Sequence, residues 1–295
     1  MPFDVYLNVA VGGVLTGLVY GLMALGLSVI FGVVRVVNFA HGEMMTIAMF
    51  IAVLAFASLH LDPLVLLVPI AAVMFVFGYV LQRGLINPFI TRPEHTQFLL
   101  LVALGIIIAN VLLILFGPDA RSVQTSYSYD SFQVGPLIVD AAKVYAAAAA
   151  IVFTAALFAF FRFTLVGKAI RAVSQDKATA ALMGIGVNRI IAITFAIGSV
   201  MAAVGGMMVG AYFDAVYPLM GWTAGIKAFT AAVLGGVGSI PGAMVAGVLI
   251  GLVETLGSAY ISSGFRDGFA FIILILTLLF MPSGLFKARK GEGKV

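Results

Sequence analysis

The sequence predicts an all-α polytopic membrane protein with about eight or nine transmembrane segments. Hydrophobic residues make up 63% of the 295-residue chain and charged residues only 9%, whereas roughly a quarter of the residues in soluble domains are charged. The apolar residues come in continuous runs of about twenty, the length that crosses the hydrocarbon core of a bilayer. A transmembrane β-barrel would instead need short segments of alternating polarity. We therefore treat residues 1–295 as a single transmembrane domain.

The first apolar run, at about 8–34, contains six glycines. Because small residues let helix backbones approach closely in lipid, this helix is expected inside the bundle.

The run at about 223–261 is too long for one span, and GGVGSIPG at 235–242 interrupts it. If this break turns at the cytoplasmic surface, nine crossings are expected. A re-entrant hairpin at membrane depth would change the count, and irregular backbone is tolerated there only against protein or water. The other runs fall at about 44–59, 63–81, 97–116, 141–161, 190–213 and 268–286.

The distribution of basic residues predicts the orientation. With the N-terminus in the periplasm, twelve of the sixteen Lys and Arg residues fall on the cytoplasmic side, in agreement with the positive-inside rule. The opposite side receives mainly aspartates, including those of a polar loop at about 117–140. A periplasmic N-terminus, a cytoplasmic C-terminus and an odd number of crossings are therefore expected. The twelve basic residues are Arg35, Arg83, Arg92, Arg162, Lys168, Arg171, Lys177, Arg189, Lys287, Arg289, Lys290 and Lys294.

A polar stretch at 162–189 separates two apolar runs and carries five of the sixteen basic residues. Arg171, Asp176 and Ala180 recur in it at spacings of four and five, which places them near one face of a helix. Gly167 and Gly184 bracket this helix, as a flexible entry and a C-terminal stop. An amphipathic helix that lies on the lipid headgroups is an alternative that the spacing leaves open.

Three motifs resemble the permease subunits of ABC importers. The pattern G-x-x-x-R-A-x-x-x-D-x-x-x-A-x-x-x-G-I at 167–185 is similar to their cytoplasmic coupling loop, in the form found in branched-chain amino acid permeases (the LivH-like subunit). RVVNFAHGE at 35–43 and GGVGSIPG at 235–242 resemble two further segments of this family, in the same order. The resemblance implies one permease domain whose coupling loop, at about 162–189, docks on an ATP-binding subunit. The implied coupling residues are Gly167, Arg171, Ala172, Asp176, Ala180, Gly184 and Ile185.

The resemblance also implies the function and the partners. The chain would be a permease of the bacterial or archaeal inner membrane for branched-chain or other hydrophobic amino acids. Two cytoplasmic ATP-binding subunits would bind ATP and magnesium, so we expect no cofactor, metal or catalytic residue here. Further partners would be a related second permease, in a heterodimer rather than a homodimer, and a periplasmic solute-binding protein. No nucleic acid is expected. Urea, short amides and small aromatic acids are the substrates associated with other relatives, so the substrate stays open.

Two polar clusters are candidates for a substrate pathway. Asn38, His41 and Glu43 lie just before an apolar run. Either they cap the following helix, with Asn38 as N-cap and Glu43 in the first turn, or they line a pathway at a helix break. In the second alternative, the break at 235–242, which contains Gly238, is the corresponding helix break in the other half of the chain. Two such breaks in corresponding positions would relate the two halves of the chain by inverted symmetry.

Two charged residues lie within apolar runs. Glu254 should face the bundle interior or water, because a charge at the bilayer centre costs roughly 2.5–3.5 kcal/mol on insertion scales. It is either a pathway group or a structural carboxyl with a partner. Lys227 is nearer to a helix end and is expected to snorkel to the interface.

A proton- or sodium-coupled secondary transporter is the alternative from another class, with Glu254 and His41 as relay groups. The pattern at 167–185 argues against it, because such a carrier has no need of a coupling loop. A structural membrane subunit without its own pathway is a third possibility.

Overall fold

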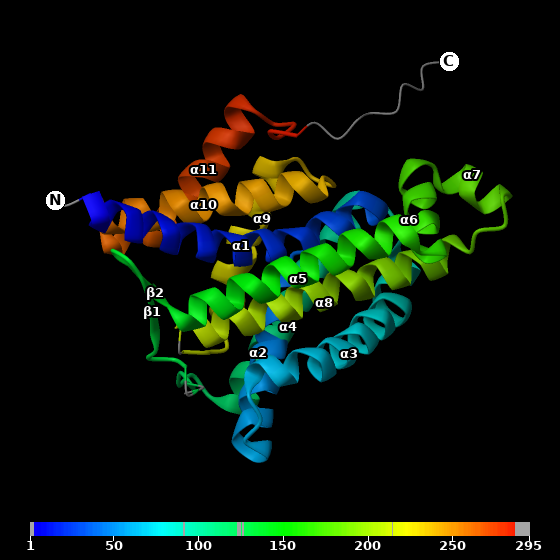
Figure 1. The fold of residues 1–295 in the computed structure, drawn as a ribbon. Coiled ribbons are helices and arrows are strands. Elements are labelled where there is room, and N and C mark those ends of the chain that lie inside the picture. Colours follow the sequence, from blue (N-terminus) through cyan, green and yellow to red (C-terminus); the bar gives the residue numbers. More distant parts are fainter. Residues whose placement is uncertain (1–2, 91, 123–124, 126, 214, 287–295) are drawn as a thin grey trace.

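The computed structural model describes residues 3–286, apart from 91, 123–124, 126 and 214, and it is almost entirely helical (Figure 1). Four basic residues of the orientation argument, Lys287, Arg289, Lys290 and Lys294, lie outside the described residues. The helices are α1 Phe3–Val34, α2 His41–Leu59, α3 Pro63–Leu81, α4 Glu94–Phe116, α5 Ala141–Phe163, α6 Leu165–Gln175, α7 Lys177–Leu182, α8 Val187–Phe213, α9 Met220–Gly235, α10 Ile240–Tyr260 and α11 Arg266–Phe280.

The predicted class of all-α polytopic membrane protein is confirmed. Among the described residues, eight helical segments are long and apolar enough to cross a membrane. The short α9, with 16 residues, is not one of them. Without α9, α10 would be the seventh span and would run parallel to α1. It instead runs antiparallel to α1, with Gly251 beside Gly13 and Gly247 beside Gly17, so α9 must pass along the bundle between α8 and α10. Counting α9, the chain passes along the bundle nine times.

The glycine-rich break between α9 and α10 is a tight turn in which Gly236 and Gly238 have positive φ. A Cβ at Gly238 would lie 3.6 Å from Cα of Gly32, two residues before the end of α1. With 32 residues at about 1.5 Å each, α1 is longer than the ~30 Å hydrocarbon core. A turn beside its last residues therefore favours a break at the membrane surface over a re-entrant hairpin.

α1 and α8 form the centre of the bundle. In each, 83% of the residues in the membrane-length window are buried, against 11–56% in the other candidate spans. The predicted interior position of the glycine-rich first helix is thus confirmed. Glycines make this possible, since a Cβ at Gly247 of α10 would lie 2.2 Å from the backbone nitrogen of Gly21, and one at Gly17 would lie 2.5 Å from Cα of Val248.

Replacing Gly247 with leucine is expected to prevent the α1–α10 contact. Ordinary overpacking costs roughly 1–3 kcal/mol, and the cost here should be larger because the clash is with backbone. The yield of monodisperse detergent-solubilised protein measures the effect. Gly84→Leu is the matched control, since a Cβ at Gly84 meets nothing within 4 Å. Equal yields of the two variants would contradict the close α1–α10 packing.

Two small features mark opposite ends of the bundle (Figure 1). The polar loop predicted at 117–140 contains an antiparallel hairpin of β1 Ser131–Val134 and β2 Leu137–Asp140, in which Ser131 pairs with Asp140 and Val134 with Leu137. The loop is tied to the start of α3, because the Tyr127 hydroxyl donates to Asp62 at 3.0 Å. Burial raises the pKa of Tyr127, and this hydrogen bond raises it further. At the other end, α6 and α7 extend beyond α5 and α8.

Candidate functional site

The predicted single helix of the polar stretch is in fact two. α6 ends at Gln175 and α7 begins at Lys177, with Asp176 between them in an extended conformation (φ −149°, ψ 113°). The prediction of one helical face shared by Arg171, Asp176 and Ala180 was therefore wrong. Aspartate favours the boundary over the helix interior, because its side chain can satisfy free backbone amides at a helix start.

Asp176 is the N-cap of α7. One carboxylate oxygen accepts hydrogen bonds from the amides of Ala178 at 2.7 Å and Thr179 at 3.1 Å, and the other accepts from the Thr179 hydroxyl at 2.8 Å. The bonds from Thr179, amide and hydroxyl, and then that from the Ala178 amide hold the pKa of Asp176 below its usual value. Asp176 is thus ionised and committed to the start of α7.

The end of α7 closes as a Schellman motif, as the sequence predicts for Gly184. The amide of Ile185 donates to the carbonyl of Ala180 at 3.1 Å, and the amide of Gly184 donates to the carbonyl of Ala181 at 3.0 Å. Gly184 has φ 80°, the left-handed conformation that favours glycine. Ala180 is buried against the bundle while Gly184 is exposed. Both ends of α7 are therefore fixed by motif residues.

Gly167 is not the flexible entry that was expected. It lies in the first turn of α6, where its amide donates to the N-cap hydroxyl of Thr164 at 2.9 Å. A Cβ there would come within 2.5 Å of the Phe160 carbonyl oxygen, so glycine permits close approach of α6 to the end of α5. Arg171 is exposed on α6, and Ala172 is partly buried beside it.

Lys177 connects α7 to the central helix α1. Its ammonium nitrogen lies 3.5 Å from the carbonyl oxygen of Val34, the last residue of α1. Burial lowers the pKa of Lys177, and the positive charge of Arg35 lowers it further. Arg35 has φ 65° and turns the chain directly after α1. A movement of α7 therefore has a direct contact through which to reach α1.

The polar cluster before α2 is buried inside the bundle. Asn38 is not the helix N-cap, because α2 begins at His41 and Ala40 holds the cap position. The side-chain oxygen Oδ1 of Asn38 instead accepts from the Ala40 amide at 3.1 Å. His41 Nε2 lies 3.0 Å from the Met23 carbonyl oxygen of α1. Glu43 is in the first turn, as predicted.

Asn38 and His41 border a cavity of about 40 Å³ between α1, α2 and α9. Glu43 is adjacent, because a Cβ at Gly221 of α9 would lie 2.6 Å from its Oε2. This oxygen is buried and has no hydrogen-bond partner in the described part of the chain. The sequence candidates thus gather where α2 meets α9, and Gly238 lies at the opposite end of α9.

Glu254 belongs to a buried ionic cluster. Its Oε1 accepts hydrogen bonds from the Tyr20 hydroxyl at 3.0 Å, from Lys227 Nζ at 3.0 Å and from Arg266 Nε at 2.6 Å. Lys227 Nζ also pairs with Asp267 Oδ1 at 2.7 Å. We call Tyr20, Lys227, Glu254, Arg266 and Asp267 the ionic cluster. It joins α1, α9, α10 and α11.

The expectation that Lys227 snorkels to the interface was wrong. Only 5% of this residue is exposed, and only 1% of Glu254, so the two neutralise each other inside the protein. Glu254 has three hydrogen-bond donors, as the alternative of a carboxyl with a partner requires. Tyr20, Arg266 and Asp267 were not singled out from the sequence, because no local pattern indicates that they meet Glu254.

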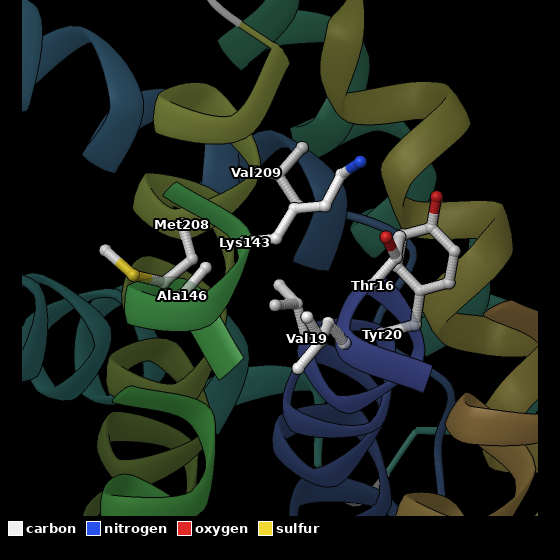
Figure 2. A pocket seen from close by; sticks show the side chains of 8 residues that line it. Thr16, Val19, Tyr20, Lys143, Ala146, Met208 and Val209 are labelled. Carbon is white, nitrogen blue, oxygen red and sulfur yellow. The ribbon is translucent and has the colours of Figure 1, made fainter. Parts of the chain in front are cut away.

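The ionic cluster borders a cavity of about 300 Å³ between α1, the end of α8, α9 and α11. Tyr20 and Val209 also border a much smaller cavity of about 10 Å³, where Figure 2 shows Thr16 and Tyr20 of α1 with Lys143 of α5 and Val209 of α8 around it. The smaller space accommodates about one water molecule. Of these two cavities, the one at the ionic cluster has room for a solute.

The chain is similar to known transport proteins over nearly its whole length. Residues 9–279 match a family described as branched-chain amino acid transport system / permease component. The high-affinity branched-chain amino acid transport system permease protein LivH of Salmonella typhimurium is 35% identical over 98% of both chains. The corresponding protein BraD of Pseudomonas aeruginosa is 33% identical over 97% of both. A probable branched-chain amino acid transport permease protein LivH of Methanocaldococcus jannaschii is 27% identical over 90% of this chain and 87% of its own.

Proposed function

Because this chain belongs to the branched-chain amino acid permease family of ABC importers, we propose that it carries branched-chain or other hydrophobic amino acids across the inner membrane. ATP hydrolysis takes place on separate subunits that bind ATP and magnesium. The permease supplies the path and responds mechanically. The rival secondary carrier receives no support from the ionic cluster, since Glu254 is bound by three donors and His41 lies in a different cavity.

The arrangement of α6 and α7 is the observation that carries the proposal. The pair extends beyond the bundle (Figure 1), and its tip presents Leu182 and Met183, which are 88% and 78% exposed. Apolar side chains on a protruding polar segment are typical of a docking surface. Arg171 and Gly184 are exposed nearby, so this segment fits a groove on an ATP-binding subunit.

The same proposal implies an orientation in the membrane and the remaining partners. The ATP-binding subunits are cytoplasmic, so the end with α6 and α7 faces the cytoplasm and the β hairpin faces the periplasm. α1 then starts on the periplasmic side, in agreement with the basic residues of 162–189. A periplasmic solute-binding protein delivers the amino acid at the hairpin end. A second, related permease completes the path in a heterodimer.

The substrate path follows α1 and α9. Both helices border the cavity at Asn38 and His41 and the larger cavity at the ionic cluster. α9 is short and ends at the glycine turn that contains Gly238. Discontinuous helices of this kind surround substrate sites in many transporters. Glu43 and Glu254, on α2 and α10, flank this path.

Purification of the tagged chain from its native membrane, followed by mass spectrometry and reconstitution, tests the assignment. ATP-binding subunits and a second permease should co-purify. The reconstituted complex should take up leucine, isoleucine or valine only with ATP and a binding protein. Purification of the chain alone, or uptake driven by an ion gradient without ATP, would refute the proposal.

Lys177→Met should weaken the link between α7 and α1. The loss of the contact with the Val34 carbonyl is expected to lower leucine uptake per ATP hydrolysed roughly fivefold, corresponding to about 1 kcal/mol for one hydrogen bond. Uptake and ATP hydrolysis are measured in the same proteoliposomes. Lys168→Met, which removes an exposed charge of α6, is the control. Equal coupling ratios in the two variants would eliminate the Lys177 contact as a transmission route.

A further inference from the structure

The cavity beside the ionic cluster has two chemically different walls. One wall carries charged and polar groups, among them Lys227, Arg266 and Asp267, and the other is apolar. Its volume of about 300 Å³ lies at the lower end of the range for small-molecule sites, ~300–1,000 Å³. The cavity is therefore matched to a small solute that has both a polar and an apolar part.

The charges of the ionic cluster balance. Lys227 and Arg266 are positive, and Glu254 and Asp267 are negative, so the cluster is formally neutral. A ligand with a net charge would leave an uncompensated charge inside the membrane, which is costly. A zwitterion leaves the sum unchanged. Neutrality thus favours a ligand that brings one positive and one negative group.

The two acidic side chains differ in their freedom to exchange partners. Glu254 is buried and accepts three hydrogen bonds on one oxygen. The Asp267 side chain is 56% exposed and reaches Lys227 at 2.7 Å. An ammonium group that enters from solution can therefore pair with Asp267, while the carboxylate of the same ligand takes its place beside Lys227.

The apolar wall suits an aliphatic side chain. Met23 of α1, Val209 of α8, and Met220 and Ala224 of α9 line it, and all four are buried. Methionine adapts to ligands of different shape because its unbranched side chain is flexible. Several aliphatic side chains of similar size can be accommodated against such a wall.

We propose that this cavity is a binding site for a zwitterionic amino acid with an aliphatic side chain, in which Lys227 receives the α-carboxylate, Asp267 the α-ammonium, and Met23, Met220 and Ala224 the side chain. The proposal rests on the function proposed above and adds a defined site within this chain. The site serves the amino acid after its release from the binding protein, since Tyr217 and Asp267 at the rim are exposed.

Photo-crosslinking locates the site directly. The probe is photo-leucine, an aliphatic amino acid with a diazirine side chain, added to the complete transporter in nanodiscs without binding protein. We expect labelled peptides from α1 and α9 that contain Met23, Met220 or Ala224, and suppression of the label by excess leucine. Labelling of other segments alone, or none, would overturn the site if proteoliposomes made from the same preparation import leucine with ATP and binding protein. Absence of leucine import would instead refute the proposed function.

Asp267→Asn separates recognition of the ammonium from a structural role. Leucine binding to the transporter in nanodiscs should weaken tenfold or more. Binding of the anion 4-methyl-2-oxopentanoate, which has no ammonium, should instead strengthen, because the loss of the Asp267 charge leaves the ionic cluster with a net positive charge. Asp140→Asn is the control, because Asp140 pairs with Lys143 but does not line the cavity. An equal loss for both ligands, or no loss for leucine, would overturn the role of Asp267.

Ala224→Leu tests the apolar wall without touching a charge. The added atoms reduce the space for the substrate side chain, so leucine binding should weaken at least tenfold while alanine binding changes less than threefold. Because leucine and alanine binding are compared in the same variant, a smaller amount of folded protein would affect both measurements equally. Equal changes for leucine and alanine would place the side chain of the substrate elsewhere.

Discussion

Replacement of Glu254 with leucine is expected to lower the free energy of unfolding by roughly 3–5 kcal/mol, the cost of removing one partner from a buried charged pair. The carboxylate is the shared acceptor of Tyr20, Lys227 and Arg266. Without this carboxylate, the Lys227 ammonium loses its buried negative partner. It keeps the half-exposed Asp267, which compensates the buried charge less well. Denaturation of the purified protein by SDS in mixed micelles measures the loss. Glu94→Leu, an exposed carboxylate at the start of α4, should have little effect.

A double-mutant cycle shows whether the effect comes from the pair. Lys227→Met removes the positive partner, and the double variant Glu254→Leu/Lys227→Met leaves neither charge of the pair. The double variant should be more stable than the sum of the single losses predicts, with an interaction energy of about 1–3 kcal/mol. Strictly additive losses would mean that Lys227 and Glu254 do not stabilise each other, and the ionic cluster would lose its structural importance.

The helical spans were predictable because the bilayer restricts what the backbone can do. Every amide and carbonyl in the hydrocarbon core needs an internal partner, so an apolar run of membrane length becomes a helix. The glycines of α1 also indicated its interior position, since Gly17 and Gly21 permit contact with Gly247 of α10. The depth of the break after Gly235 in the membrane could not be predicted from the sequence. It follows from the contact of this turn with the end of α1, which is distant in the sequence.

The polar interior was less predictable. Lys227 and Glu254 are 27 residues apart, and Tyr20 is more than 200 residues from both. The local sequence therefore predicted that Lys227 lies at the membrane interface. Its burial is possible because Glu254, which is distant in the sequence, neutralises its charge. Asp176 is a different case, because aspartate is one of the residues that favour the N-cap of a helix and can be recognised there in a sequence. The spacing of the family motif suggested a continuous helix and concealed this local signal.

Asp176→Lys is expected to abolish ATP-driven uptake while the protein still inserts and folds. Lysine has no acceptor for the amides of Ala178 and Thr179, and its positive charge is unfavourable at a helix N-terminus. The start of α7 should therefore unwind, and Leu182 and Met183 would no longer be presented in one orientation. Uptake into proteoliposomes and the ATPase activity stimulated by the loaded binding protein measure the loss.

Asp176→Asn is the matched variant, because asparagine caps helices about as well as aspartate. It should retain most of the uptake if the cap matters, and lose it if the partner recognises the negative charge itself.

The stability of the α7 start should also depend on pH. Since hydrogen bonds hold the pKa of Asp176 below its usual value, the ionised cap contributes its full stability above the ordinary aspartate pKa and loses it as the pH falls through the lowered value. Acidification within that window should thus destabilise the start of α7 in the wild type more than in Asp176→Asn, whose amide does not titrate.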